Sequence, residues 1–182
     1  MRKYSGVMLP PNTPHEVWNA DAESEAHLEV VAPGSSRDLV AMLKSARPRK
    51  VENAAQYIRT PMVPVQADMK PGLNGVTFAS RALGGAVQMR IDSTLPGQSG
   101  PKTHVHKFQQ VYVSIEGHTT VEYGLTSFPL PKYSAVIIQP GVVHTNSNTS
   151  STIERHITLL MPQLEDPNEP LDIEYERKGP VR

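Results

Sequence analysis

Three histidines and one glutamine are spaced so that they could meet around a metal ion. His104 and His106 stand two residues apart, Gln110 follows four residues later, and His144 follows a Pro-Gly turn at residues 140–141. Because successive side chains of a strand point to opposite faces, residues two apart share a face. His104 and His106 should therefore point to one spot, and His144 could add a third imidazole from a neighbouring strand. Imidazole binds Fe, Mn, Ni, Cu and Zn, and a catalytic centre keeps a coordination position open.

The segments that carry these residues have the pattern of short strands. Apolar residues alternate with polar ones, and seventeen prolines and twelve glycines supply turns between the segments. The expected strands are residues 76–81, 86–91, 103–107, 109–115, 119–123, 135–138, 142–146 and 153–161. This pattern predicts an all-β fold, an antiparallel sandwich or barrel.

The same residues resemble the two sequence motifs of the cupin superfamily. The first motif runs Gly, five residues, His-x-His, three or four residues, Glu, six residues, Gly; the second runs Gly, five residues, Pro-x-Gly, two residues, His, three residues, Asn. The matching positions are His104, His106, Gly117, Gly141, His144 and Asn148, and Pro140 stands one residue after the proline position of the second motif. Four positions depart from the pattern, because the opening glycine is misplaced, Gln110 replaces the usual Glu, Tyr133 replaces the first glycine of the second motif, and the proline of that motif is shifted by one residue.

The resemblance implies an antiparallel double-stranded β-helix, the cupin jelly roll, over residues 60–165. It also implies one divalent transition metal, with Fe preferred and Zn, Mn or Ni as alternatives. The implied ligands are His104, His106 and His144, with Gln110 as a weak fourth through its carbonyl oxygen. A barrel that has lost its metal is the competing interpretation.

The N-terminus repeats part of the C-terminal half of the chain. Residues 2–33 align without a gap to residues 131–162, and ten positions are identical, among them His15 with His144 and Asn19 with Asn148. Residues 1–33 are therefore expected to be a partial cupin repeat, the half-barrel that carries the second motif.

Two explanations of the repeat remain open. The chain resembles the C-terminal part of a tandem bicupin, or its N-terminal strands pack on the C-terminal barrel or on another subunit. Residues 34–59 are expected to form a linker with a short helix at 37–46, which Pro48 ends. Residues 166–182 are expected to form a charged, proline-rich tail that is loosely docked or frayed.

Composition limits the partners and the compartment. Eighteen basic residues balance eighteen acidic ones, so no global charge attracts nucleic acid or a membrane surface. The chain has no cysteine, so histidine must carry any soft-metal chemistry. No stretch is apolar enough to cross a bilayer, which makes the cytoplasm the default location. We expect a small-molecule substrate and a homodimer or higher homo-oligomer.

Gln110 constrains the chemistry of the expected site. A divalent ion among neutral ligands keeps its full charge, which favours a bidentate anionic substrate such as a catecholate, an enolate or a 2-oxo acid. Tyr112 follows on the same strand face and could transfer a proton, although a buried ring with a satisfied hydroxyl is an equal alternative. Arg90 could bind a carboxylate if its strand turns that face inward, and would otherwise be solvated.

These residues favour a mononuclear metal-dependent enzyme. A non-haem iron dioxygenase acting on a small phenolic, diketone or keto-acid substrate is the leading interpretation that the resemblance implies. A redox-neutral Zn or Mn cyclase, isomerase, lyase or hydrolase is the first alternative, and a non-catalytic cupin that binds a small molecule is the second. Fold analogy by itself says little about the reaction.

Overall fold

The chain forms two compact units, Met1–Thr60 and Pro61–Arg182, in a computed structural model that describes residues 3–10, 13, 15–32, 52–80, 83, 87–162 and 170–176. The helix predicted at residues 37–46 lies outside the described residues. Within the described part of the chain, no helix combines the length and the apolar character needed to span a membrane.

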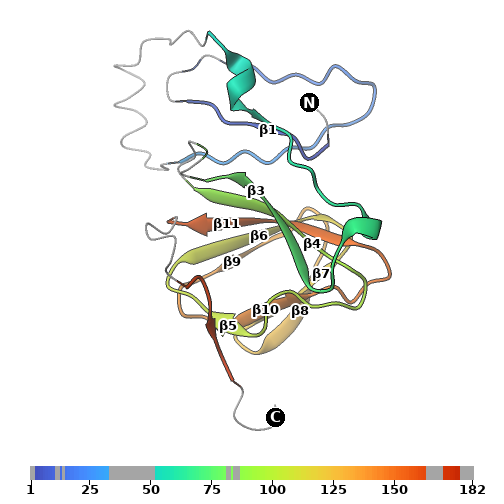
Figure 1. Cartoon of the computed structure of the whole chain (residues 1–182), viewed down its shortest axis with the longest axis vertical. Coiled ribbons are helices and arrows are strands. Elements are labelled where there is room, and N and C mark those ends of the chain that lie inside the picture. The colour runs from blue at the N-terminus through green and yellow to red at the C-terminus, as the bar shows by residue number, and fades with distance from the viewer. Residues whose placement is uncertain are drawn as a thin grey trace. The chain divides into compact units, whose positions relative to one another are not determined.

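The second unit consists of two five-stranded sheets that face each other (Figure 1). All paired strands run antiparallel, as the sequence predicted. One sheet has the order β3 (Leu73–Ala79), β4 (Gln88–Thr94), β11 (Glu154–Met161), β6 (Gln109–Glu116) and β9 (Ala135–Ile138). The other has the order β12 (Ile173–Glu174), β5 (His104–Val105), β10 (His144–Ser147), β7 (Thr119–Tyr123) and β8 (Thr126–Leu130).

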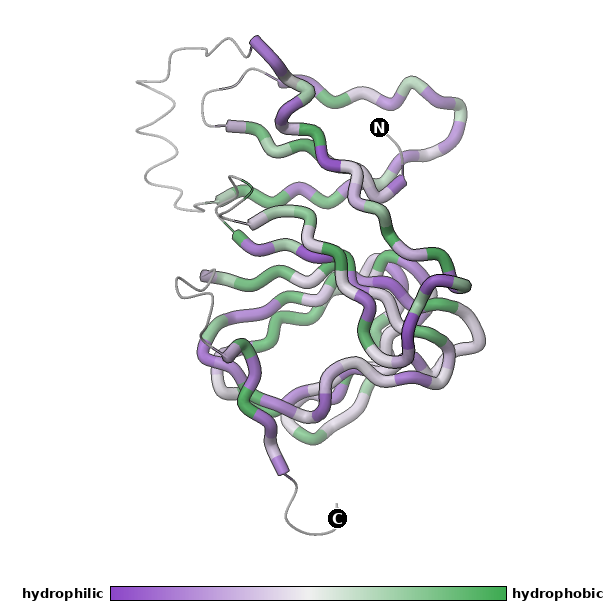
Figure 2. Tube along the Cα trace, in the orientation of Figure 1, coloured by the Kyte–Doolittle hydropathy of each residue, from purple (hydrophilic) through white to green (hydrophobic). Residues whose placement is uncertain are grey.

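Strand β6 carries the expected alternation of buried and less buried residues. Gln110, Tyr112 and Ser114 are buried, whereas Val111 and Val113 between them are half-buried. Hydrophobic and hydrophilic residues also alternate along the strands of this unit in Figure 2. The shared inward face predicted for Gln110 and Tyr112 is therefore confirmed.

The interior of the barrel is apolar in one region and polar in another. Tyr112, Val121, Leu130 and Ile138 form a buried apolar cluster. Most inner positions of β4 and β11 hold acidic, basic and hydroxyl side chains instead, among them Asp92, Thr94, Glu154, His156 and Thr158. Burying such groups costs stability unless they are paired, so a polar interior points to a binding role.

Strand β8 was not predicted from the sequence. Its residues do not alternate, and Pro129 interrupts the pattern. In the structure β8 pairs with β7 alone and forms the edge of its sheet. A proline is tolerated at a sheet edge because its missing N–H leaves no partner strand without a donor.

Gly117 ends the first motif because the backbone there leaves no room for a side chain. Its φ angle is +67°, in the left-handed region, and a Cβ atom would lie 2.4 Å from the carbonyl oxygen of Ile153. Gly117 is thus required for the tight turn between β6 and β7.

The first unit contains a two-stranded antiparallel sheet and a short 3₁₀ helix, Ala54–Tyr57. Strand β1 (Gly6–Val7) pairs with β2 (Ile58–Arg59). In the alignment of residues 2–33 with residues 131–162, β1 falls on the first two residues of β9. The residue two positions before each strand adopts a left-handed φ, 64° at Tyr4 and 66° at Tyr133, and a lysine ammonium lies over each tyrosine ring.

Hydrogen bonds also recur between the two copies of the repeat. The Nδ2 atom of Asn19 donates to the carbonyl of Glu23, and Nδ2 of Asn148 donates to the carbonyl of Thr152. In both copies the asparagine Oδ1 accepts a backbone N–H two residues on, at 3.0 Å. The first unit therefore keeps the local turn geometry of the barrel, which supports the duplication inferred from the sequence.

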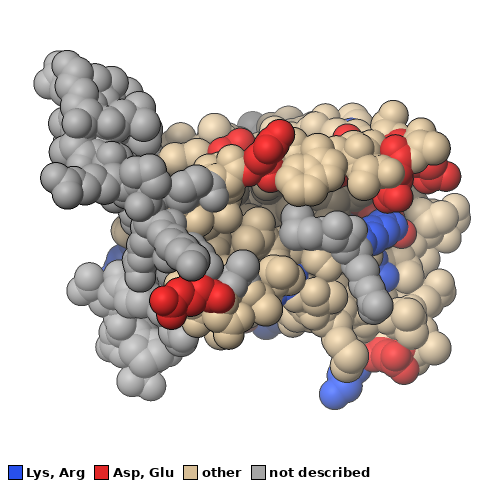
Figure 3. Space-filling model, turned by 90° about the horizontal axis from the view of Figure 1, so that it is seen from above, with Lys and Arg blue, Asp and Glu red and all other residues tan. Residues whose placement is uncertain are grey.

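Charged side chains on the face shown in Figure 3 stand apart or in small groups among uncharged residues. This distribution follows the equal numbers of acidic and basic residues in the chain.

Candidate functional site

Three histidines converge inside the barrel of the second unit. His104 begins β5, His106 follows that strand directly, and His144 begins β10. Because β5 and β10 pair with His104 opposite His144, the two motifs meet at this point although forty residues separate them. All three side chains are buried, and one ligand nitrogen from each lies within 4.8 Å of the others. The predicted cluster is confirmed for the histidines.

Hydrogen bonds to the backbone determine which ring nitrogen faces the site. The Nδ1 atoms of His104, His106 and His144 lie 2.7, 2.8 and 2.9 Å from the carbonyl oxygens of Lys102, Phe108 and Val142. A carbonyl only accepts, so each Nδ1 carries the proton and, in the neutral imidazole, each Nε2 presents a lone pair. Such fixed tautomers are typical of metal-ligating histidines.

Gln110 adds an amide oxygen to the same point. Its Oε1 lies 2.8 Å from Nε2 of His106 and 3.0 Å from Nε2 of His144. These atoms are all acceptors when the imidazoles are neutral, and acceptors at such distances repel one another unless a cation lies between them. The donor set therefore fits a transition metal bound by three nitrogens and one neutral oxygen.

The environment of His144 favours the neutral, metal-binding form of its ring. Burial, together with the nearby His104 and His106, lowers its pKa to about 4, although the hydrogen bond to Val142 opposes this. At neutral pH a lone pair is therefore available at Nε2 without the loss of a proton.

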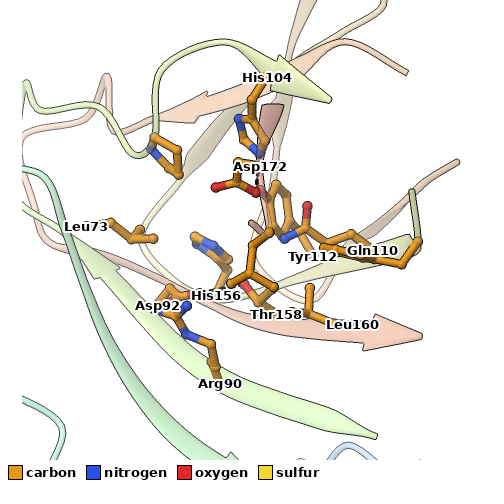
Figure 4. A pocket seen from close by; sticks show the side chains of 13 residues that line it. Leu73, Arg90, Asp92, His104, Gln110, Tyr112, His156, Thr158, Leu160 and Asp172 are labelled. Carbon is orange, nitrogen blue, oxygen red and sulfur yellow. Dashed lines mark hydrogen bonds and ion pairs between the residues drawn. The ribbon is translucent and has the colours of Figure 1, made fainter. Parts of the chain in front are cut away.

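A cavity of about 50 Å³ opens beside the histidines (Figure 4). His104 and Asp172 lie at one side of it, Arg90 and Asp92 lie at the opposite side, and His156 and Tyr112 lie between them. The remaining lining residues are Leu73, Pro101, Phe108, Gln110, Thr158, Leu160 and Leu171. This volume suits a ligand of a few heavy atoms or several water molecules.

Arg90 lines this cavity. Of the two positions considered from the sequence, its side chain therefore takes the inward one. Its Nη2 lies 3.0 Å from Oδ1 of Asp92, and Oδ2 of Asp92 accepts a hydrogen bond of 2.7 Å from Thr158. A Cβ atom on Gly75 would fall 1.9 Å from Nη2 of Arg90, so the glycine makes space for the guanidinium. Arg90 is held at the wall of the cavity, where it can bind an anion.

His156 and Glu154 form a buried pair on β11. Nδ1 of His156 lies 2.5 Å from Oε1 of Glu154, and the hydroxyl of Thr119 donates to the same oxygen. Burial opposes protonation of the imidazole, but the charge and hydrogen bond of Glu154 and the charge of Asp92 raise the pKa of His156 above its usual value. No described residue forms a hydrogen bond with Nε2 of His156, which borders the cavity.

Tyr112 packs edge-on against His156, with ring centroids 4.7 Å apart. Burial and the negative charges of Asp92, Asp172 and Glu154 raise the pKa of its phenol far above the usual value. Tyr112 therefore keeps its proton at neutral pH and can donate a hydrogen bond, but it cannot act as a phenolate base.

Sequence reasoning missed three acidic residues of the site. Asp92 lies beyond the predicted end of its strand, because β4 runs to Thr94. Glu154 was not singled out as a site residue, and Asp172 belongs to the segment that was expected to be a loose tail. The alternation along β11 could have placed Glu154 on the same face as His156. No sequence pattern pointed to Asp172.

Solved structures similar to this chain include cupins. A cupin 2 domain-containing protein from Halorhodospira halophila is 19% identical, with a TM-score of 0.50 over 58% of this chain and 71% of that chain. An RmlC-like cupin from Shewanella frigidimarina is 20% identical, with a TM-score of 0.46 over 54% of this chain and 83% of that chain. KdgF from Halomonas sp. is 18% identical, with a TM-score of 0.47 over 54% and 86%.

No protein-family model matches the sequence, and no curated protein matches it. The structural likeness to the Halorhodospira protein therefore bears on the fold alone. It agrees with the two antiparallel sheets and with the pairing of β5 with β10, which joins the two histidine motifs. On this basis the second unit of the chain, Pro61–Arg182, has the fold of a cupin barrel.

Proposed function

We propose that this chain is a mononuclear metal-dependent cupin enzyme acting on a small anionic substrate. One observation carries the proposal: three Nε2 lone pairs and the amide oxygen of Gln110 converge inside a buried site. A bound ion would polarise substrate oxygens and, if it were iron, could also pass electrons to dioxygen.

A bound divalent ion and Arg90 would both attract an anionic substrate, against the carboxylates of Asp92 and Asp172, which also line the cavity. The donors His104, His106, His144 and Gln110 are neutral, so they do not cancel the charge of an ion. On the opposite wall, the guanidinium of Arg90 can donate two parallel hydrogen bonds to a carboxylate. A substrate with two anionic oxygens would fit this arrangement, and a 2-oxo acid, a diketone or a small phenol would supply them.

Two further residues are suited to proton transfer. Tyr112 would donate a hydrogen bond to a substrate oxygen, because its phenol keeps its proton. His156, held by Glu154 through Nδ1, has Nε2 free toward the cavity and would give or take a proton there. The apolar side chains of Phe108, Leu160 and Leu171 would limit water around the substrate.

A non-haem iron dioxygenase is the leading type of reaction. Three histidine ligands would leave three positions of a six-coordinate ion, enough for a chelating substrate and dioxygen once the weak ligand Gln110 is displaced, and the barrel interior shields the reacting atoms.

A redox-neutral Zn or Mn enzyme is the second candidate, and a separate observation favours it. The His156–Glu154 pair and Tyr112 provide acid–base groups that isomerases, lyases and hydrolases need.

The test begins with the metal content of the purified chain. We expect near-stoichiometric metal in the wild type, its loss in His106→Ala, and its retention in His118→Ala, since His118 is exposed. Oxygen uptake with small phenols, diketones and 2-oxo acids then separates the two classes, because only the iron dioxygenase consumes O₂. If the wild type holds no metal after incubation with Fe, Mn, Ni and Zn, the proposal fails. Metal without turnover of any substrate would favour a binding protein.

A further inference from the structure

We propose that the carboxylate of Asp172 is an additional ligand of the ion held by His104, His106 and His144. It would supply the negative charge that Gln110 cannot. The inference rests on the proposed function, because it requires the three-histidine site to hold an ion.

The C-terminal strand holds Asp172 beside the metal-binding motif. β12 pairs with β5, with Ile173 opposite Val105 and Glu174 opposite His104. Continuing this register by one residue places Asp172 opposite His106, on the face to which both histidines point. The N–H of Tyr175 also donates to the carbonyl of Thr103 at 2.9 Å, so the pairing extends past β12.

The contact between Asp172 and the site involves the ligand atom of a histidine. Oδ1 of Asp172 lies 3.4 Å from Nε2 of His104. Two ligand atoms bound at roughly 2.1 Å to one five- or six-coordinate ion lie about 3.0 to 3.6 Å apart when the angle between them is about 90° to 120°. Asp172 reaches only His104 in the structure, and its side chain is 40% exposed, which leaves it room to turn toward the other histidines.

Asp172 would supply a negative charge that the other donors of the site lack. The donors contributed by the two motifs are all neutral, and among the described residues Asp172 is the one carboxylate in ion-pair contact with any of the three histidines. A carboxylate binds hard and borderline divalent ions more strongly than an amide oxygen does. Asp172 would raise the affinity of the site and fasten the segment 170–176 over the cavity that it lines.

The matched pair of variants is Asp172→Asn and Glu174→Gln. Each removes one negative charge from the same segment, but Glu174 pairs with the exposed Lys102 at 3.1 Å. With Co²⁺ and Zn²⁺ as probes, we expect the dissociation constant of Asp172→Asn to rise about 10- to 100-fold. That of Glu174→Gln should change by less than about threefold. The absorption of the Co²⁺ protein should change only in Asp172→Asn.

A second experiment moves the charge instead of removing it. In the double variant Gln110→Glu/Asp172→Asn, the carboxylate returns to the site from the other strand, and affinity should recover to within about tenfold of the wild type. Hydrogen exchange of residues 172–176 should slow when Zn²⁺ is added to the wild type, and should not slow in Asp172→Asn.

The outcomes separate this inference from the proposed function. If Asp172→Asn binds metal as tightly as the wild type, Asp172 is only an ion-pair partner of His104 that the metal displaces, and the inference is overturned while the metal site stands. If the wild type binds neither Co²⁺ nor Zn²⁺, the proposed function itself fails. Since Asp172 is partly exposed, Asp172→Asn should fold, and Asp172→Glu provides a variant that keeps the charge.

Discussion

Nδ1 of His156 lies 2.5 Å from Oε1 of Glu154, and the two residues are 1% and 0% exposed. A charged pair inside a barrel is costly, because both groups lose their hydration. Thr119 donates to the same carboxylate oxygen and offsets part of this cost. His156 also borders the cavity, so we interpret the pair as part of the proposed binding and proton-transfer machinery.

The first prediction concerns the protonation of His156. The variant Glu154→Gln removes the larger of the two charges that raise the pKa of the imidazole, so that burial and Arg90 lower the pKa against the charge of Asp92 alone. In the wild type His156 should stay protonated to a pH above 6.5, and in the variant it should be neutral at pH 7. Titration of the ring by ¹⁵N NMR measures this. Equal titration midpoints in the two proteins would contradict the assignment.

The second prediction is that the stability of the metal-free protein passes through a maximum near pH 6.5. The pKa of His144 is about 4 in the folded state and ~6.5 when unfolded, so the unfolded state binds more protons between these values. Stability from this group therefore rises with pH across that window. The pKa of His156 is raised instead, so its contribution is present below pH ~6.5 and is lost as pH rises through the folded pKa.

Urea unfolding in the presence of a chelator, from pH 4 to 9, measures this profile. His144→Gln should flatten the acid side of the curve by an amount on the order of 1–3 kcal/mol, and should leave the alkaline side unchanged. An unchanged acid side in the variant would show that other groups cause the slope.

The third prediction concerns the space that Gly75 leaves for Arg90. In Gly75→Ala the new methyl group would displace the guanidinium from Asp92, since the Cβ position lies 1.9 Å from Nη2. The end of an arginine side chain moves easily, so stability should fall by no more than about 1 kcal/mol. Affinity of the Zn²⁺-loaded protein for pyruvate, a small 2-oxo acid, should weaken by ~10-fold or more.

Calorimetry with Gly75→Ala and with Arg90→Gln tests this effect. Both variants should lose pyruvate affinity to a similar extent, because both remove the same guanidinium from the cavity. Full affinity in Arg90→Gln would place the anion elsewhere.

The fourth prediction compares two glycines with left-handed backbones. Gly117→Ala introduces both a strained φ and a clash with the carbonyl oxygen of Ile153, whereas a Cβ at Gly141 meets no atom within 4 Å. We expect Gly141→Ala to cost about 1 kcal/mol and Gly117→Ala to cost roughly 2 kcal/mol more. Thermal unfolding of both variants measures the difference, and equal losses would mean that the turn relaxes around the new side chain.

Local spacing in the sequence was enough to predict the convergence of the three histidines. Strand alternation alone brings His104 and His106 to one face, and the Pro-Gly turn positions His144. The same rule gave Gln110 and Tyr112 their inward face. It could not predict β8, because Pro129 breaks the periodic pattern and only pairing with β7 makes this segment a strand.

Tertiary structure alone decided what surrounds that core. The sequence favoured an outer position for Arg90, because charged side chains are mostly exposed and Val87, Met89 and Ile91 make the other face of its predicted strand apolar. Pairing of β4 between β3 and β11 turned Arg90 and Asp92 toward the cavity. Asp172 lies 66 residues after His106 in the chain, and only the register of β12 on β5 brings it to the histidines. Such contacts depend on long-range pairing, which no local period encodes.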